Sequence, residues 1–144
     1  MRILGVDLGD KRVGLAVSDA LEITAHGLET LLRQNKKQLI GDLKAVCERE
    51  KASEVVIGLP INMNGTEGPK AKEARDFVAE LQASLEVPVR AWDERLSSRQ
   101  ADRLMVEEGL SRKKQKEHSD RLAATLILQS YLEFRRVSHK NKEV

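Results

Sequence analysis

Three acidic residues stand where carboxylates could act together. Asp7 lies near the end of an apolar run, Glu94 follows a second short run, and Asp120 follows Ser119 at the start of a predicted helix. A carboxylate among apolar neighbours is costly to bury alone, so a cation, a metal or a hydrogen-bond network must compensate its charge. Mg²⁺ and Mn²⁺ take oxygen ligands from carboxylates and water. Two such ions about 4 Å apart can activate a water and stabilise the leaving oxygen in phosphodiester hydrolysis.

Asp7 and Asp120 also have simpler explanations. Asp7 could cap a turn through its own backbone, and Asp120 could be favoured by the helix dipole. The dipole alone does not require the inner face of the helix, where the spacing of Ala124 and Ile127 places Asp120. Asp93 and Glu94 would point to opposite sides if their strand continued, so we expect only one of them to join Asp7.

The elements that would position these residues begin with three strands. Residues 2–8 and 12–18 predict a hairpin around a short glycine-containing turn at residues 9–11. Residues 22–32 predict a third strand, which completes an antiparallel meander. Alternation along the first strand gives it two faces. Leu4, Val6 and Leu8 share one face, and Ile3, Gly5 and Asp7 share the other.

The later elements alternate between helices and strands. The predicted segments are a helix over 35–50, a buried strand over 54–59, a loop over 60–68, a helix from 69 to about 85, a strand over 88–92, and helices over 97–108 and 119–136. The apolar stripe of the second helix is predicted to comprise Ala71, Ala74, Val78, Leu81 and Leu85.

This order predicts an α/β fold, a mixed five-stranded sheet with helices on both faces. The first, fourth and fifth strands would be parallel, and sites in such sheets lie beyond the carboxyl ends of the strands. Asp7 and Glu94 both occur there, and Asp120 opens the helix that packs against the sheet. We expect one domain over residues 1–136 and a frayed tail over residues 137–144.

Composition narrows the class of protein. The net charge of +2 does not by itself indicate a nucleic-acid binder, and four aromatic residues are too few for a base-stacking platform. The single cysteine, Cys47, lies on a predicted apolar helix stripe and favours a reducing, cytoplasmic setting. No apolar run approaches the roughly 20 residues of a membrane span, and no signal peptide is evident, so we expect no membrane association.

Basic residues lie close to the acidic ones in sequence. Lys11, Arg12 and Arg95 flank the carboxylates and could hold phosphates near bound metals. A second basic group precedes the last helix: Arg112, Lys113 and Lys114. A solvated or ion-paired surface role is the alternative for Lys11, Arg12 and Arg95, and for Arg12 the two interpretations weigh the same.

The motifs together resemble the YqgF family, whose members are described as Holliday-junction resolvases and as pre-16S rRNA nucleases. The resemblance covers residues 2 to about 134 and is carried by four segments in order, residues 6–14, 57–65, 92–97 and 119–124. It implies an RNase H-like fold and metal-dependent cleavage that matures the 5′ end of 16S rRNA in the cytoplasm. It also implies an acidic triad of Asp7, Glu94 and Asp120. Asp10 stands where the family often has a hydroxyl residue, and Asn64 where it often has Asp.

Other functions remain open at this point. The motif Asp7-x-Gly9-x-Lys11 also resembles the phosphate loop of actin-like and sugar-kinase ATPases, although those proteins close two such domains around a nucleotide. A resolvase of four-way DNA junctions would need a symmetric dimer, and no dimer patch is evident, so we expect a monomer or a weak homodimer. A non-catalytic RNA-binding assembly factor would use the same basic segment. The sequence leaves the choice of RNA or DNA and the number of metals undetermined.

Overall fold

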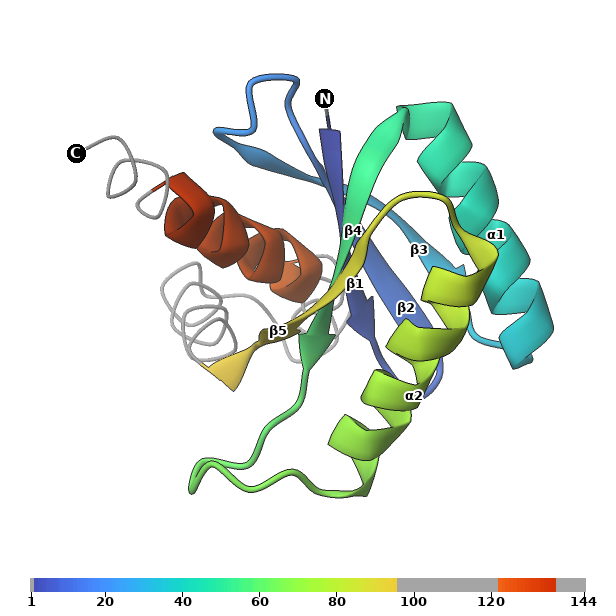
Figure 1. Cartoon of the computed structure of the whole chain (residues 1–144), viewed down its shortest axis with the longest axis vertical. Coiled ribbons are helices and arrows are strands. Elements are labelled where there is room, and N and C mark those ends of the chain that lie inside the picture. The colour runs from blue at the N-terminus through green and yellow to red at the C-terminus, as the bar shows by residue number, and fades with distance from the viewer. Residues whose placement is uncertain (1, 96–121, 137–144) are drawn as a thin grey trace, which may run out of the picture.

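The computed structural model describes residues 2–95 and 122–136, which form five strands and three helices. Strands β1 to β3 and helix α1 come first, followed by β4, α2, β5 and a helix over residues 122–136 (Figure 1). Their bounds are β1 Arg2–Leu8, β2 Arg12–Ser18, β3 Ala25–Leu32, α1 Lys36–Glu50, β4 Ala52–Leu59, α2 Pro69–Ser84 and β5 Val89–Asp93.

The strands form one mixed sheet in the order β3-β2-β1-β4-β5. β1 pairs antiparallel with β2, and β2 pairs antiparallel with β3, so the predicted meander is confirmed. β1, β4 and β5 are mutually parallel, as the alternation of strands and helices predicts. The carboxyl ends of these three strands therefore meet at one edge of the sheet.

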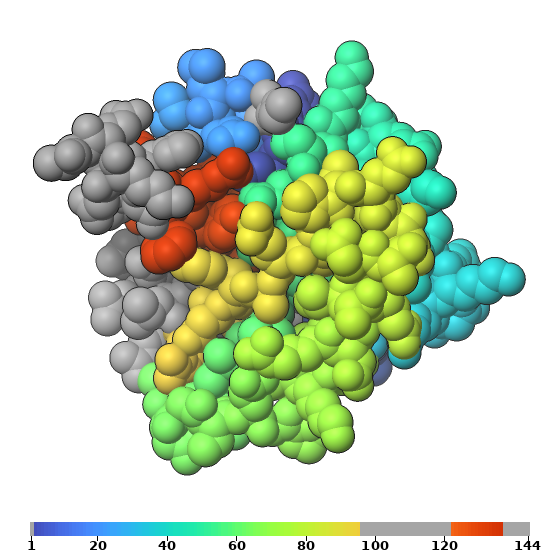
Figure 2. Space-filling view, viewed as in Figure 1, coloured from blue at the N-terminus to red at the C-terminus, as the bar shows by residue number. Residues whose placement is uncertain are grey.

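Helices cover both faces of the sheet (Figure 1). α1 and α2 pack against one face, where the core includes Leu4 and Val6 of β1. The helix 122–136 packs against the other face, where the core includes Ile3, Val56 and Leu128. The predicted alternation along β1 is confirmed, and it places Asp7 on the face covered by the helix 122–136. β5 lies at the surface between α2 and this helix (Figure 2).

Two details of the sequence prediction were wrong. The third strand begins at Ala25 rather than residue 22, because Asp19 Oδ1 accepts hydrogen bonds from the backbone N–H groups of Ile23 and Thr24 and holds them in a turn. The buried residue at the centre of the α2 stripe is Phe77, whereas Val78 is only partly buried. Phe77 lies three residues after Ala74 and so shares its face.

Some predictions fall outside the described residues. They are the helix over 97–108, the start of the last helix at residues 119–121, and the tail over 137–144. None of the described helices combines the length and apolar character that a membrane span requires.

Candidate active site at the carboxyl ends of the parallel strands

Asp7 and Glu94 approach each other at the edge where the parallel strands end. Asp7 is the sixth residue of β1, and Glu94 directly follows β5. The Glu94 backbone N–H donates a hydrogen bond to the carbonyl of Leu59 at 3.3 Å, which ties the start of the next segment to the end of β4. Both side chains are partly buried. The sheet therefore brings together two acidic residues that are 87 positions apart in the sequence.

The Glu94 carboxyl group is a weaker acid than an ordinary glutamate. Burial disfavours its charged form, and the negative charges of Asp7 and Asp93 add to the effect, so its pKa rises from the ordinary 4.5 to about 7. A partly buried carboxyl group beside a second carboxylate is electrostatically unfavourable, and a bound cation would offset the repulsion between them. Within the described residues, Asp7 and Glu94 supply oxygen donors suited to a hard divalent cation, but no group of three or more acidic, histidine or cysteine side chains forms there.

Asp93 has a different role from Glu94. Its carboxylate is paired with Arg95, with Nη2 to Oδ2 at 2.7 Å and Nε to Oδ2 at 2.9 Å. It also accepts a hydrogen bond from the Arg95 backbone N–H, and these interactions hold the pKa of Asp93 below its usual value. Asp93 is thus engaged with its own neighbour, while Glu94 experiences the charge of Asp7.

Two glycines let the helix 122–136 lie close to the sheet beside these carboxylates. A Cβ on Gly5 would lie 2.8 Å from the Leu128 Cβ. A Cβ on Gly58 would lie 2.5 Å from Glu94 Oε2 and 2.6 Å from Ile127 Cδ1. All three distances are too short for a real side chain, so glycine at these two positions makes room for the helix and for the Glu94 carboxylate.

The direction of this helix follows from contacts at its two ends. Ile127 lies over Gly58, near the end of β4, whereas Arg135 Nη1 lies 3.4 Å from the buried Glu54 near the start of β4. Glu54 also accepts from Arg90 Nε at 2.8 Å. The helix therefore runs antiparallel to β4, and its first described residues point toward the edge that holds Asp7 and Glu94.

Several predicted site residues lie outside the described part of the chain. They are Asp120, Arg112, Lys113 and Lys114. Among the described basic residues, Lys11 and Arg12 are exposed at the end of the hairpin turn. Arg95 lies beside the loop 60–68, with its Nη1 atom 3.9 Å from the position of a Cβ on Gly65.

The polar residues of the loop 60–68 are used within the loop itself. Asn62 Nδ2 donates to the Thr66 hydroxyl at 3.1 Å, and Asn64 Oδ1 accepts from the same hydroxyl at 2.6 Å. Gly65 adopts a φ of 87°, a conformation that favours glycine. These bonds account for both asparagines as turn residues.

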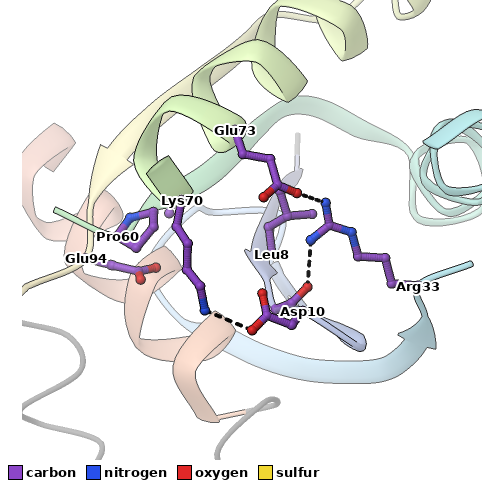
Figure 3. Close-up of a pocket in the computed structure, with 9 residues that line it drawn as sticks. Leu8, Asp10, Arg33, Pro60, Lys70, Glu73 and Glu94 are labelled. Atoms are coloured by element: carbon purple, nitrogen blue, oxygen red, sulfur yellow. Dashed lines mark hydrogen bonds and ion pairs between the residues drawn. The ribbon is translucent and has the colours of Figure 1, made fainter. Parts of the chain in front are cut away.

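The structure also reveals a charged cavity that the sequence did not predict. Its volume is about 150 Å³, and Glu94 lies on its wall (Figure 3). Lys70 Nζ pairs with Asp10 at 2.8 Å, and Arg33 pairs with Glu73 and donates to the carbonyl of Gly9 at 2.9 Å. The four charged residues come from the hairpin turn, the segment after β3 and the start of α2. Their separation of up to 63 positions in the sequence concealed this grouping.

Two solved structures share the fold of this chain. A Thermus thermophilus RuvC structure in complex with a Holliday junction matches with a TM-score of 0.53 at 23% identity, covering 94% of this chain and 96% of that chain. The fowlpox virus Holliday junction resolvase matches with a TM-score of 0.55 at 15% identity, covering 92% and 99% of the two chains. At these identities the likeness establishes the fold alone, and it confirms the predicted RNase H-like class.

Relatives identified from their sequences are more similar to this chain than these two solved structures are. Proteins named "Putative pre-16S rRNA nuclease" from Halothermothrix orenii and Syntrophomonas wolfei are 43% and 49% identical to this chain. The first match covers 96% of this chain and 99% of the relative, and the second covers 92% and 94%. The sequence profile of the RuvX family, described as Holliday junction resolvase, matches residues 1–134. The chain therefore belongs to the RuvX family.

Proposed function

We propose that this protein is a metal-dependent endonuclease that cleaves precursor 16S rRNA near its 5′ end in the cytoplasm. The observation that carries the proposal is the Glu94 carboxyl group, partly buried against Asp7 and with a pKa raised to about 7. Family membership and the names of the relatives support a hydrolase acting on nucleic acid. Those names also favour precursor rRNA as its substrate.

The chain's own carboxylates would hold the metal. Asp7 and Glu94 would bind Mg²⁺ or Mn²⁺, with Asp120 as a third ligand from the start of the last helix. Such ions supply an activated water and stabilise the leaving oxygen of the phosphodiester. Glu94 must lose its proton to act as a ligand, and the positive charge of the cation favours that loss. Gly58 keeps the space in which the Glu94 carboxylate lies.

Basic side chains would orient the nucleic acid. Lys11, Arg12 and Arg95 stand near the carboxylates in the chain, and the segment 112–114 precedes Asp120. We propose that they bind backbone phosphates, which positions a strand without reading its bases. The scarcity of aromatic residues favours recognition of shape and backbone over base stacking.

Cleavage of a four-way DNA junction is the second candidate function. The description of the RuvX family and the fold shared with a junction-bound RuvC favour it. Such an enzyme makes two coordinated cuts, which require two sites in a symmetric dimer. A precursor rRNA end requires one site, which a monomer or weak homodimer provides.

Substitution of the carboxylates tests the proposal. Asp7→Asn, Glu94→Gln and Asp120→Asn should each abolish cleavage of a 5′-extended 16S precursor in Mg²⁺ or Mn²⁺, because each removes a ligand charge. Without metal, their melting temperatures should stay level or rise, because like-charge repulsion is relieved. Asp93→Asn is the matched control and should retain more activity. Full activity in any of the first three variants would remove that residue from the proposed site.

A further inference from the structure

The ion pair between Lys70 and Asp10 borders the cavity that contains Glu94. The two side chains are 68% and 70% exposed, and their charged atoms lie 2.8 Å apart. Their mutual attraction raises the pKa of Lys70 and lowers that of Asp10. In Figure 3 the Lys70 side chain extends from the start of α2 across the cavity toward Asp10, with the Glu94 carboxylate on the neighbouring wall.

Arg33 on the same cavity is held much more firmly. Its guanidinium donates to the Gly9 carbonyl at 2.9 Å and also pairs with Glu73, and its side chain is only 21% exposed. Arg33 thus connects the hairpin turn to α2 and forms a fixed wall. Lys70 has the single carboxylate partner Asp10 among the described residues, so its ammonium group is the cation that can exchange partners.

We propose that Lys70 binds a backbone phosphate of the nucleic acid, and that Asp10 holds its ammonium group until the strand enters the cavity. The inference rests on the proposed nuclease function and adds a phosphate-binding subsite to it. The ligand class is a nucleic-acid phosphodiester, because an ammonium group contacts phosphate oxygens without distinguishing bases. Lys70 would therefore contribute to affinity and to placement of the strand.

The energetics favour such an exchange. An exposed ion pair contributes little to stability because water screens both charges, so release of Lys70 from Asp10 has a small cost. Asp10 remains in contact with solvent after release and needs no new protein partner. The lysine side chain is flexible and carries three donors, which allows it to turn from a carboxylate to a phosphate. The cavity has room for several water molecules that a phosphate group could displace.

A second exposed ion pair provides a matched control. Lys36 Nζ lies 3.0 Å from Glu80, with side chains 54% and 44% exposed, and neither residue lines the cavity. Lys36→Gln and Lys70→Gln therefore remove the same charge from similar exposed pairs on the same molecule. Both variants should melt at nearly the wild-type temperature, since exposed pairs contribute little to stability.

The test measures binding of a fluorescent 5′-extended 16S RNA fragment to the full chain by anisotropy, over a range of salt concentrations. A chelator prevents metal-dependent cleavage during the measurement. Lys70→Gln should raise the Kd by roughly fivefold at 0.1 M salt. The negative slope of log affinity against log salt should become shallower by about 0.7, which corresponds to the loss of one phosphate contact. Lys36→Gln should change neither quantity. Equal values for the two variants would overturn the assignment.

Asp10 supplies an independent arm of the same experiment. Asp10→Asn should lower the Kd by roughly two- to fivefold, because Lys70 is no longer held by a carboxylate. That gain should disappear in the double variant with Lys70→Gln. An undiminished gain in the double variant would show general charge repulsion and would overturn the inference. A wild-type protein that binds the RNA while both arms fail would refute this inference alone, whereas a protein that neither binds nor cleaves would also refute the proposed function.

Discussion

The raised pKa of Glu94 makes the stability of the protein depend on pH in a direction opposite to that of most carboxylates. A group whose pKa is higher in the folded state than in the unfolded chain contributes stability at low pH. That contribution is complete below about pH 4.5 and is lost as the pH rises through about 7. Glu94→Gln keeps the shape of the side chain but cannot ionise, so the variant should not show this loss.

The magnitude follows from the interval between the two pKa values. Moving a pKa from 4.5 to about 7 corresponds to at most about 3 kcal/mol. Glu94 is partly exposed, so solvent screening reduces the effect. We therefore expect Glu94→Gln to gain about 1–2 kcal/mol relative to wild type between pH 5 and pH 8.

Urea unfolding in the presence of a chelator measures this difference. The free energy of unfolding of wild type and Glu94→Gln would be compared at several pH values from 5 to 8, with equal slopes against urea as a check on two-state behaviour. Asp93→Asn is the control, because the lowered pKa of Asp93 keeps it ionised throughout this range. Because the Asp93 charge is the smallest of the three causes of the raised Glu94 pKa, the stability difference between Asp93→Asn and wild type should change with pH less than that of Glu94→Gln. A difference between wild type and Glu94→Gln that does not change with pH would refute the burial and repulsion argument.

Two further perturbations test the geometry and the basic segment. Gly58→Ala should reduce cleavage by on the order of 100-fold and destabilise the fold by about 1–3 kcal/mol, because its Cβ would displace the Glu94 carboxylate and Ile127. Gly41→Ala in α1 is the control, because a Cβ there meets nothing within 4 Å. Its free energy of unfolding in urea should instead rise by about 0.5–1 kcal/mol. Alanine at all of residues 112–114 should weaken RNA binding and flatten its salt dependence with little loss of stability. An unchanged salt slope, or full cleavage by Gly58→Ala, would contradict the corresponding argument.

Local pattern was sufficient to predict much of the fold. The alternation in residues 2–8 assigned Asp7 to one face of β1, and the buried run before Pro60 indicated a parallel strand. The apolar stripe correctly placed Cys47 in the core, where burial raises the pKa of its thiol to about 11. These features depend on neighbours in the sequence, which periodicity describes well.

Features that depend on distant neighbours could not be predicted in this way. Gly58 lies in a sequence typical of a strand. The reason why this position cannot carry a side chain appears only when Glu94 and Ile127 are placed against it. The pairing of Lys70 with Asp10 joins the hairpin turn to α2 across the carboxyl edge of the sheet. No spacing rule relates such residues, because tertiary packing alone brings them together. Asp120 lies outside the described residues, and its place in the triad stays a prediction.

The most direct test of the proposed function is a side-by-side cleavage assay on two substrates. Purified wild-type protein and Asp7→Asn would each receive a 5′-extended 16S precursor RNA and a four-way DNA junction, with Mg²⁺ or Mn²⁺ and with chelator. We expect wild type with metal to cut the RNA near the mature 5′ end, and Asp7→Asn to leave it intact. Paired symmetric nicks in the junction with the RNA untouched would contradict the rRNA assignment, and cleavage that persists in Asp7→Asn would contradict the site.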